Sequence, residues 1–284
     1  MIDRTALART ALRKALSIRR RLPIDSAHSV CPEDVAARLG LDVRYLDLPS
    51  LEGMFVREQA LIVLPSHRPP GRRSFSAAHE LGHFAFDHGT RVDQQTERQD
   101  FAAAEPEEFL ADAFAGFLLM PRRALTASIA RAGLTGMSLD PKSVFKLSCE
   151  FGVGYETILA HLHYSLRLLD RSPLEELLRA KPKTVRRELC PSGTGTNLVY
   201  VSKHWQGRPV DAAVGDDILL PATACVDGID LEYAGPAPDH AEQYRAIRPG
   251  VGRVSCGSWS AFVRVQKANY VGRAVYRHLK DPDE

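Results

Sequence analysis

The stretch RSFSAAHELGHFAFDH, residues 73 to 88, decides how the rest of the chain is organised. It holds His79 and His83, four residues apart, with Glu80 directly after the first histidine. On a helix, residues four apart share one face, so both imidazoles can bind one metal ion while Glu80 projects toward a bound water. The motif predicts a helix that carries the centre of a zinc hydrolase. Two core or surface histidines on an ordinary helix would give the same pattern, so support must come from the rest of the chain.

A catalytic zinc needs a third protein ligand and an open position for water. The segment EFLADAFAGFLLMP, residues 108 to 121, predicts a second helix on which Glu108 and Asp112 share one face. Glu108 can reach the metal. Asp112 can accept the remaining ring N–H of a ligand histidine, which fixes its tautomer. One helix therefore offers both a ligand and its support.

Two neighbouring acids, Glu105 and Glu107, compete with Glu108 for the role of third ligand. With Pro106 between them, they equally fit the first turn of a helix, where carboxylates favour the helix dipole. Glu108 is preferred because it lies with Asp112 at the margin of an apolar stripe that buries this helix. The stripe consists of Phe109, Ala113, Phe117 and Met120.

Composition and charge are those of an ordinary globular protein. The chain has 284 residues, of which 44% are hydrophobic and 25% charged, enough for one large or two modest domains. The formal net charge of +2 favours neither a nucleic-acid nor a membrane partner. Basic residues crowd residues 4 to 21, where helical spacing of the apolar positions predicts an amphipathic helix with a solvated basic face. A functional patch or a targeting sequence is the alternative there.

Cysteine usage and hydropathy bear on the compartment. The five cysteines are scattered without a Cys-x-x-Cys pair, so we expect no disulfide framework and a reducing cytoplasm. The apolar part of the N-terminal segment is too short and interrupted for a signal peptide or a membrane span.

The segment before the histidine motif predicts a small sheet. A short helix is expected from Cys31 to Gly40, a strand from Leu41 to Leu48, and a hairpin formed by residues 53 to 57 and 60 to 64. An edge strand beside the metal helix could bind an extended polypeptide through main-chain hydrogen bonds. The loop of residues 65 to 73 either lines this cleft with cationic groups or is simply solvated.

Residues 138 to 170 have the outline of a helix-turn-helix. Asp140 and Pro141 begin one helix, Gly152 ends it, and Tyr155 to Asp170 forms another. DNA binding does not follow, because the second helix carries almost no Lys or Arg. A separate hypothesis is that a polar ring of this helix enters the cleft and stabilises an oxyanion, the alternative being buried or solvated side chains. The rings concerned are those of His161, His163 and Tyr164.

From about Ser172 onward, prolines separate short strand-like runs such as those at residues 198 to 201, 217 to 220 and 261 to 265. We expect a second, mainly β domain with mixed elements. Its sequence carries no recognisable chemistry. It could regulate access to the metal or dock a partner.

Three separated blocks resemble the ImmA/IrrE family of zinc-dependent endopeptidases: residues 53 to 55, residues 73 to 83, and residues 108 to 121. The resemblance covers roughly residues 30 to 125. It implies His79, His83 and Glu108 as zinc ligands and Glu80 as catalytic base, in the manner of a gluzincin. Family members often carry a histidine near the position of His88, although a helix-terminal cation explains that residue equally well.

The resemblance also implies a substrate, since members of this family typically cut a helix-turn-helix repressor and so derepress stress, phage or mobile-element genes. Two other functions stay open: a DNA-binding transcription regulator with structural zinc, and a catalytically silent zinc sensor. Manganese could replace zinc, because a His-His-carboxylate set suits both ions. The oligomeric state is left open.

The prediction is an α+β chain in three parts. Residues 1–125 form a zincin-like peptidase domain with an N-terminal helix, residues 126–171 a helix-turn-helix-like segment, and residues 172–284 a mixed or β domain with a possible regulatory role. We expect a cytoplasmic enzyme that acts on a protein partner, without direct DNA binding and without a membrane.

Overall fold

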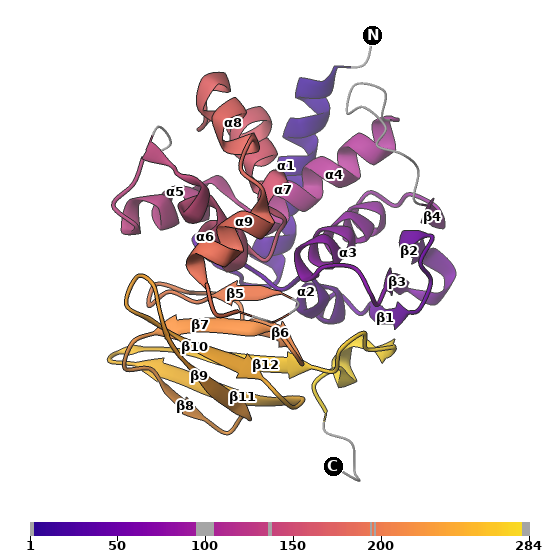
Figure 1. Cartoon of the computed structure of the whole chain (residues 1–284). Coiled ribbons are helices and arrows are strands. Elements are labelled where there is room, and N and C mark those ends of the chain that lie inside the picture. The colour runs from indigo at the N-terminus through magenta and orange to yellow at the C-terminus, as the bar shows by residue number, and fades with distance from the viewer. Residues whose placement is uncertain (1–2, 95–104, 136–137, 194, 196, 280–284) are drawn as a thin grey trace.

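The computed structural model describes residues 3–94, 105–135, 138–193, 195 and 197–279. Helices from the first part of the chain lie on one side of the molecule, with a mixed five-stranded sheet to which the end of the chain adds one strand. Two four-stranded sheets from the second part lie on the other (Figure 1). The α+β prediction is confirmed.

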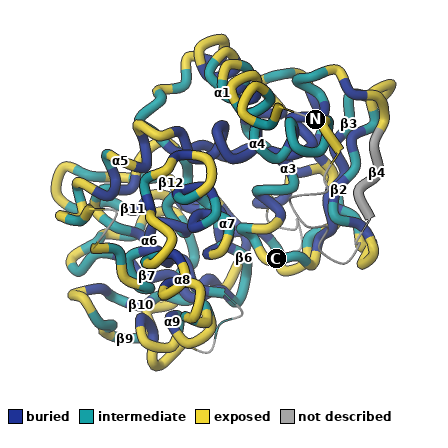
Figure 2. Tube along the Cα trace, turned by 90° about the horizontal axis from the view of Figure 1, so that it is seen from above, coloured by how far each residue is buried: buried dark blue, intermediate teal, exposed yellow. Residues whose placement is uncertain are grey.

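Three helices form the centre of the first part. Helix α4 (Pro106–Leu119) packs against both α1 (Arg4–Arg21) and α3 (Pro70–Ala85). The amphipathic prediction for α1 is correct, since its buried face meets α4 while its outer face is exposed (Figure 2).

One residue of the basic cluster on α1 does not lie on the solvated face. Arg19 is only 1% exposed and donates hydrogen bonds to the backbone oxygens of Leu118, Asp25 and His28. Burial lowers its pKa to about 10. The guanidinium thus satisfies the Leu118 carbonyl at the end of α4, where the last carbonyls of a helix lack intrahelical partners, and two carbonyls of the loop after α1.

The first sheet has the order β13-β1-β3-β2-β4. Its bounds, together with those of the short helix α2 beside it, are α2 Pro32–Arg38, β1 Asp42–Leu46, β2 Leu51–Val56, β3 Leu61–Pro65, β4 Arg91–Gln94 and β13 Gly272–Arg273. The hairpin prediction holds, because β2 and β3 pair antiparallel. Strand β4 pairs with the side of β2 that does not face β3. The edge strands of this sheet are therefore β4 and β13. The sequence gives no local signal for this pairing.

The helical segment that follows also shows the expected outline. Its elements are α5 Arg122–Arg131, α6 Pro141–Phe151, α7 Tyr155–Ala160, a π-helical turn His161–Ser165, α8 Arg171–Leu178 and α9 Pro182–Leu189. Asp140 caps α6 by accepting from the Ser143 backbone N–H at 2.9 Å, and Gly152 ends it with a left-handed φ of 63°. The second helix stops earlier than expected, because Arg167 turns the chain with a φ of 52°.

The C-terminal strands build two sheets, ordered β5-β7-β10-β9 and β6-β12-β11-β8. Their bounds are β5 Leu198–Tyr200, β6 Val210–Ala213, β7 Asp217–Pro221, β8 Cys225–Asp227, β9 Leu231–Ala237, β10 Ala241–Ala246, β11 Gly250–Cys256 and β12 Trp259–Gln266. The three strand-like runs noted in the sequence fall within β5, β7 and β12, except that Val201 follows the end of β5. The proposed boundaries at residues 125 and 171 stay predictions.

The chain finally returns to the first part of the molecule, where β13 pairs with β1 (Figure 1). A partly buried charge cluster joins the two parts near this point. Arg264 of β12 binds Asp34 of α2 at 2.9 Å and Asp211 of β6 at 2.7 Å. Asp211 also accepts from Arg208 at 3.3 Å. Ion pairs therefore hold the C-terminal sheets against the first part. The strand β13, which follows these sheets in the chain, adds to this by pairing with β1.

Two further findings concern the helices and the cysteines. None of the helices in the described part of the chain is long and apolar enough to cross a membrane. All five cysteines are free thiols, as expected from their scattered positions.

Candidate functional site

Helix α3 presents His79 and His83 toward α4, and both rings are buried. Their Nε2 atoms lie 3.0 Å apart. Glu108, in the first turn of α4, places Oε2 at 3.3 Å from His79 Nε2 and Oε1 at 3.7 Å from His83 Nε2. The structure thus brings together the two histidines and the carboxylate that the sequence singled out.

Close approach of the two helices makes this meeting possible. Gly82 of α3 faces Ala111 of α4, and a Cβ at residue 82 would lie 2.8 Å from the Ala111 Cα. Glycine is therefore required for this helix contact. The helix pairing sets the distance from Glu108 to the imidazoles.

The atoms of His79, His83 and Glu108 that could bind a metal all lie within 4.8 Å of one another. Among the residues that the structure describes, this is the group suited to hold a metal ion. The competing acids do not join it: Glu105 is the exposed N-cap residue of α4, and Glu107 belongs to the same first turn without contributing to the group. Two imidazoles and one carboxylate are a donor set that catalytic zinc sites use.

The outer ring nitrogens of both histidines have partners. His79 Nδ1 lies 2.8 Å from Asp112 Oδ1, the contact expected from the sequence. His83 Nδ1 lies 2.9 Å from the Nδ1 atom of His88. With each Nε2 facing the candidate metal position, each Nδ1–H donates to its partner, which fixes tautomer and ring orientation.

The position of His88 follows from the way α3 ends. Asp87 adopts a left-handed φ of 59°, and the His88 backbone N–H donates to the His83 oxygen at 3.0 Å. The His88 ring stacks on Phe86 with centroids 5.8 Å apart. His88 therefore contacts a candidate ligand, a role that the sequence did not predict.

Glu80 is only 1% exposed and lies against strand β2. A Cβ at Gly53 would lie 2.2 Å from Glu80 Oε1, so the backbone of β2 passes directly beside the carboxylate. Gly53 belongs to the block of residues 53 to 55, and its own sequence context offers no reason for a glycine there. The structure supplies one, since any side chain here would push Glu80 aside.

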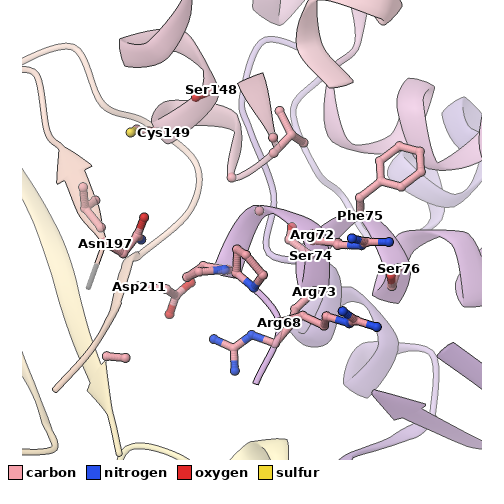
Figure 3. A pocket seen from close by; sticks show the side chains of 18 of the residues that line it. Arg68, Arg72, Arg73, Ser74, Phe75, Ser76, Ser148, Cys149, Asn197 and Asp211 are labelled. Carbon is pink, nitrogen blue, oxygen red and sulfur yellow. The ribbon is translucent and has the colours of Figure 1, made fainter. Parts of the chain in front are cut away.

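A cavity of about 1080 Å³ connects this group to the C-terminal sheets. His79, Glu80 and Asp112 lie at one end of it. Figure 3 shows side chains of α3 and the loop before it on one side, and Asn197 and Asp211 of the C-terminal part across the open space. The C-terminal sheets therefore form a wall of the cleft beside the candidate metal group.

The three polar rings considered for oxyanion stabilisation do not enter this cavity. His161 is buried against α4, donates to the Met120 oxygen at 3.0 Å, and fills the space left by Gly116. His163 contacts the Leu169 oxygen, and Tyr164 is 73% exposed. None of the three is among the described residues that line the cleft. The hypothesis was wrong because the π-helical turn His161–Ser165 packs His161 against α4 and leaves Tyr164 in solvent.

Comparison with protein families agrees with this geometry. Residues 36–163 match Peptidase_M78, the model of an IrrE N-terminal-like domain. Residues 36–163 are therefore an IrrE-like peptidase domain, as the resemblance to the ImmA/IrrE family implied. The IrrE-like domain contains α3 and α4 with the whole His-His-Glu group, and it extends past the region of resemblance into the helix-turn-helix-like segment. The C-terminal sheets lie outside it. A search of curated proteins found no match.

Proposed function

We propose that the chain is a zinc-dependent endopeptidase that cuts a protein partner in the cytoplasm. The observation that carries this proposal is the convergence of His79, His83 and Glu108 beside a cleft, with Glu80 buried next to them. Membership of a peptidase family supports the same reaction class. The free cysteines are consistent with a reducing compartment.

His79 Nε2, His83 Nε2 and one Glu108 oxygen would hold the ion, leaving a position for solvent. Zinc, when bound there, supplies a Lewis acid for the scissile carbonyl and a means of acidifying water. Asp112 and His88 keep the two imidazoles oriented. The donor set would also accept manganese, and zinc is chosen because buried imidazoles with a single carboxylate suit it best.

Glu80 acts as general base. Its carboxylate takes a proton from the attacking water and later passes it to the leaving amine. Burial beside β2 fixes the carboxylate and keeps bulk water from competing for it. Glu80 is not one of the three described residues suited to hold the ion, which supports a role in proton transfer.

The partner we propose is a helix-turn-helix transcriptional repressor, whose cleavage would derepress stress or mobile-element genes. This choice rests on the family resemblance. A cleft walled on one side by the C-terminal sheets is large enough to accept a polypeptide segment. Direct DNA binding by the chain is not part of the proposal, because α7 carries Glu156 and neither Lys nor Arg.

The test is Glu80→Gln in the full chain, compared with Glu175→Gln on the exposed face of α8. Each protein is co-expressed with the repressor encoded beside its gene, and fragments are identified by mass spectrometry. We expect Glu80→Gln to retain zinc and lose cleavage, and Glu175→Gln to keep both. Lost zinc or preserved cleavage in Glu80→Gln contradicts the proposal. A wild-type chain that binds zinc and cuts nothing indicates the silent sensor instead.

A further inference from the structure

The amino-terminal end of α3 and the loop before it line the same cavity as the candidate metal group (Figure 3). This region holds three arginines, Arg68, Arg72 and Arg73, all of which line the cavity. The sequence left open whether the loop is merely solvated. The structure shows that its cationic residues face the cleft.

Two of these arginines share a single acid. Arg68 lies 2.8 Å from Glu52 Oε1, and Arg72 binds both oxygens of Glu52 at 2.9 Å. Arg72 is half-exposed, so it remains accessible from the cleft.

Arg73 is buried without an ion pair to any described carboxylate. It is 7% exposed, and its contacts are the Ser66 oxygen at 3.3 Å and the face of Tyr45 at 5.2 Å. With its amide oxygen turned toward Arg73, Gln266 accepts from both terminal nitrogens at 2.9 Å. The Nε atom has no hydrogen-bond partner among the described residues. A buried guanidinium whose described hydrogen-bond partners are all neutral is costly unless an anion joins it.

Asp216 is a buried acid that interacts electrostatically with Arg73. Burial raises the pKa of Asp216, and the backbone N–H of Ala213 already donates to its carboxylate at 2.9 Å. The other acid of this wall, Asp211, is occupied by Arg264 and Arg208. Neither acid forms an ion pair with Arg72 or Arg73 among the described residues, although Arg73 partly offsets the rise that burial causes in the pKa of Asp216.

The helix end itself adds to the positive potential. Pro69 is its N-cap residue and makes no side-chain capping bond. Ser74, in the second turn, is 7% exposed, lines the cavity and has an Oγ without a partner among the described residues. Helix N-termini favour anions through their dipole and their N–H groups.

From these observations we infer that the amino-terminal end of α3 is a subsite for an acidic side chain of the polypeptide substrate. The inference rests on the proposed peptidase function. Arg72 precedes His79 by seven residues, which is about 10 Å along a helix. An extended chain advances about 3.3 Å per residue, so the acidic residue lies about three residues from the bond that is cut.

The test measures binding without cleavage. Full-length, zinc-loaded Glu80→Gln protein is titrated with two pools of short fluorescent peptides that differ only in carrying Glu or Gln at one fixed position. We expect the Glu pool to bind about tenfold more tightly, the size of one charge-assisted contact. Arg73→Gln and the half-exposed Arg72→Gln should each reduce the preference severalfold. Arg171→Gln, an exposed arginine on α8 outside the cavity, is the matched control and should leave it unchanged.

Equal affinity for the two pools overturns the subsite, whatever the peptidase does. If Arg73→Gln fails to fold because Arg73 is buried, Arg72→Gln still tests the subsite, since Arg72 is half-exposed. Inorganic phosphate is titrated in parallel: phosphate that binds at the same arginines while the pools bind equally would replace the inference by a free-anion site. Cleavage of a peptide library by the wild-type chain is scored separately. Absent cleavage contradicts the proposed function, whereas cleavage without acidic preference contradicts the subsite alone.

Discussion

Gly53 of β2 lies against Glu80 of α3 so closely that a Cβ at residue 53 would be 2.2 Å from the carboxylate oxygen. This contact couples the first sheet to the residue proposed as general base. The sheet therefore does more than support α3, because its second strand sets where the carboxylate can lie.

The variant Gly53→Ala tests this coupling. The added methyl group should displace the carboxylate, and misplacement of a catalytic group by about 1 Å can cost on the order of 100-fold in rate. We expect kcat to fall by about that factor with zinc content unchanged. Gly89→Ala is the matched control, since a Cβ there meets nothing within 4 Å. Full activity in Gly53→Ala would show that the Glu80 position is not set by β2.

Loss of either imidazole support should weaken metal binding. Asp112→Asn and His88→Ala each remove the partner of one Nδ1 atom, and such changes typically cost about 10 to 100-fold in metal affinity. The measurement is the zinc Kd by competition with a chelating dye, with exposed Asp170→Asn as control. An unchanged Kd in both variants would mean that the two contacts do not orient the ligands.

Burial of His161 predicts a pH dependence of stability. Burial lowers the pKa of His161 to about 4, against about 6.5 in the unfolded chain. Between these values the unfolded chain binds a proton that the folded chain does not. The contribution is therefore complete above pH 6.5 and is lost as the pH falls toward 4.

Urea unfolding at pH 7 and pH 5 measures this effect. Going from pH 7 to pH 5, His161→Gln, which keeps a donor for the Met120 oxygen, should lose about 2 kcal/mol less stability than wild type. His240→Gln, an exposed histidine, should behave like wild type. Equal losses in wild type and His161→Gln would exclude the burial effect.

The charge cluster between the two parts of the molecule is expected to be sensitive to the loss of its acid. Asp211→Asn leaves Arg264 and Arg208 without their shared carboxylate, and a partly buried charge that loses its hydrogen-bond partner costs about 1 to 3 kcal/mol. Denaturant unfolding should show this loss, while Asp227→Asn on the exposed strand β8 should change stability little. A loss below about 1 kcal/mol would mean that the C-terminal sheets are held by β13 and apolar contacts alone.

Sequence patterns identified what is local in this fold. Spacing placed His79 and His83 on one helix face and Glu108 with Asp112 on another, and Asp140 and Gly152 marked the ends of α6 correctly. These features depend on residues a few positions apart. Their physical cause, helical periodicity and capping, acts within one element.

Features that depend on pairing between distant segments escaped the sequence. Strand β4 covers β2, and β13 joins the sheet from the far end of the chain. The spacing of basic residues placed Arg19 on a solvated face. In the structure its guanidinium is buried and donates to the carbonyls of Asp25, nearby in sequence, and Leu118, distant in sequence. His161 seemed available for the cleft because nothing in its own helix revealed that Gly116 of α4 leaves a space for its ring.

The most direct test of the central claim is anomalous diffraction at the zinc edge from crystals of the zinc-loaded full chain. The account predicts one strong peak within bonding distance of His79 Nε2, His83 Nε2 and a Glu108 oxygen, about 2.0 to 2.2 Å from each. A peak elsewhere, or a peak at the two histidines that leaves Glu108 out of the coordination, would contradict it.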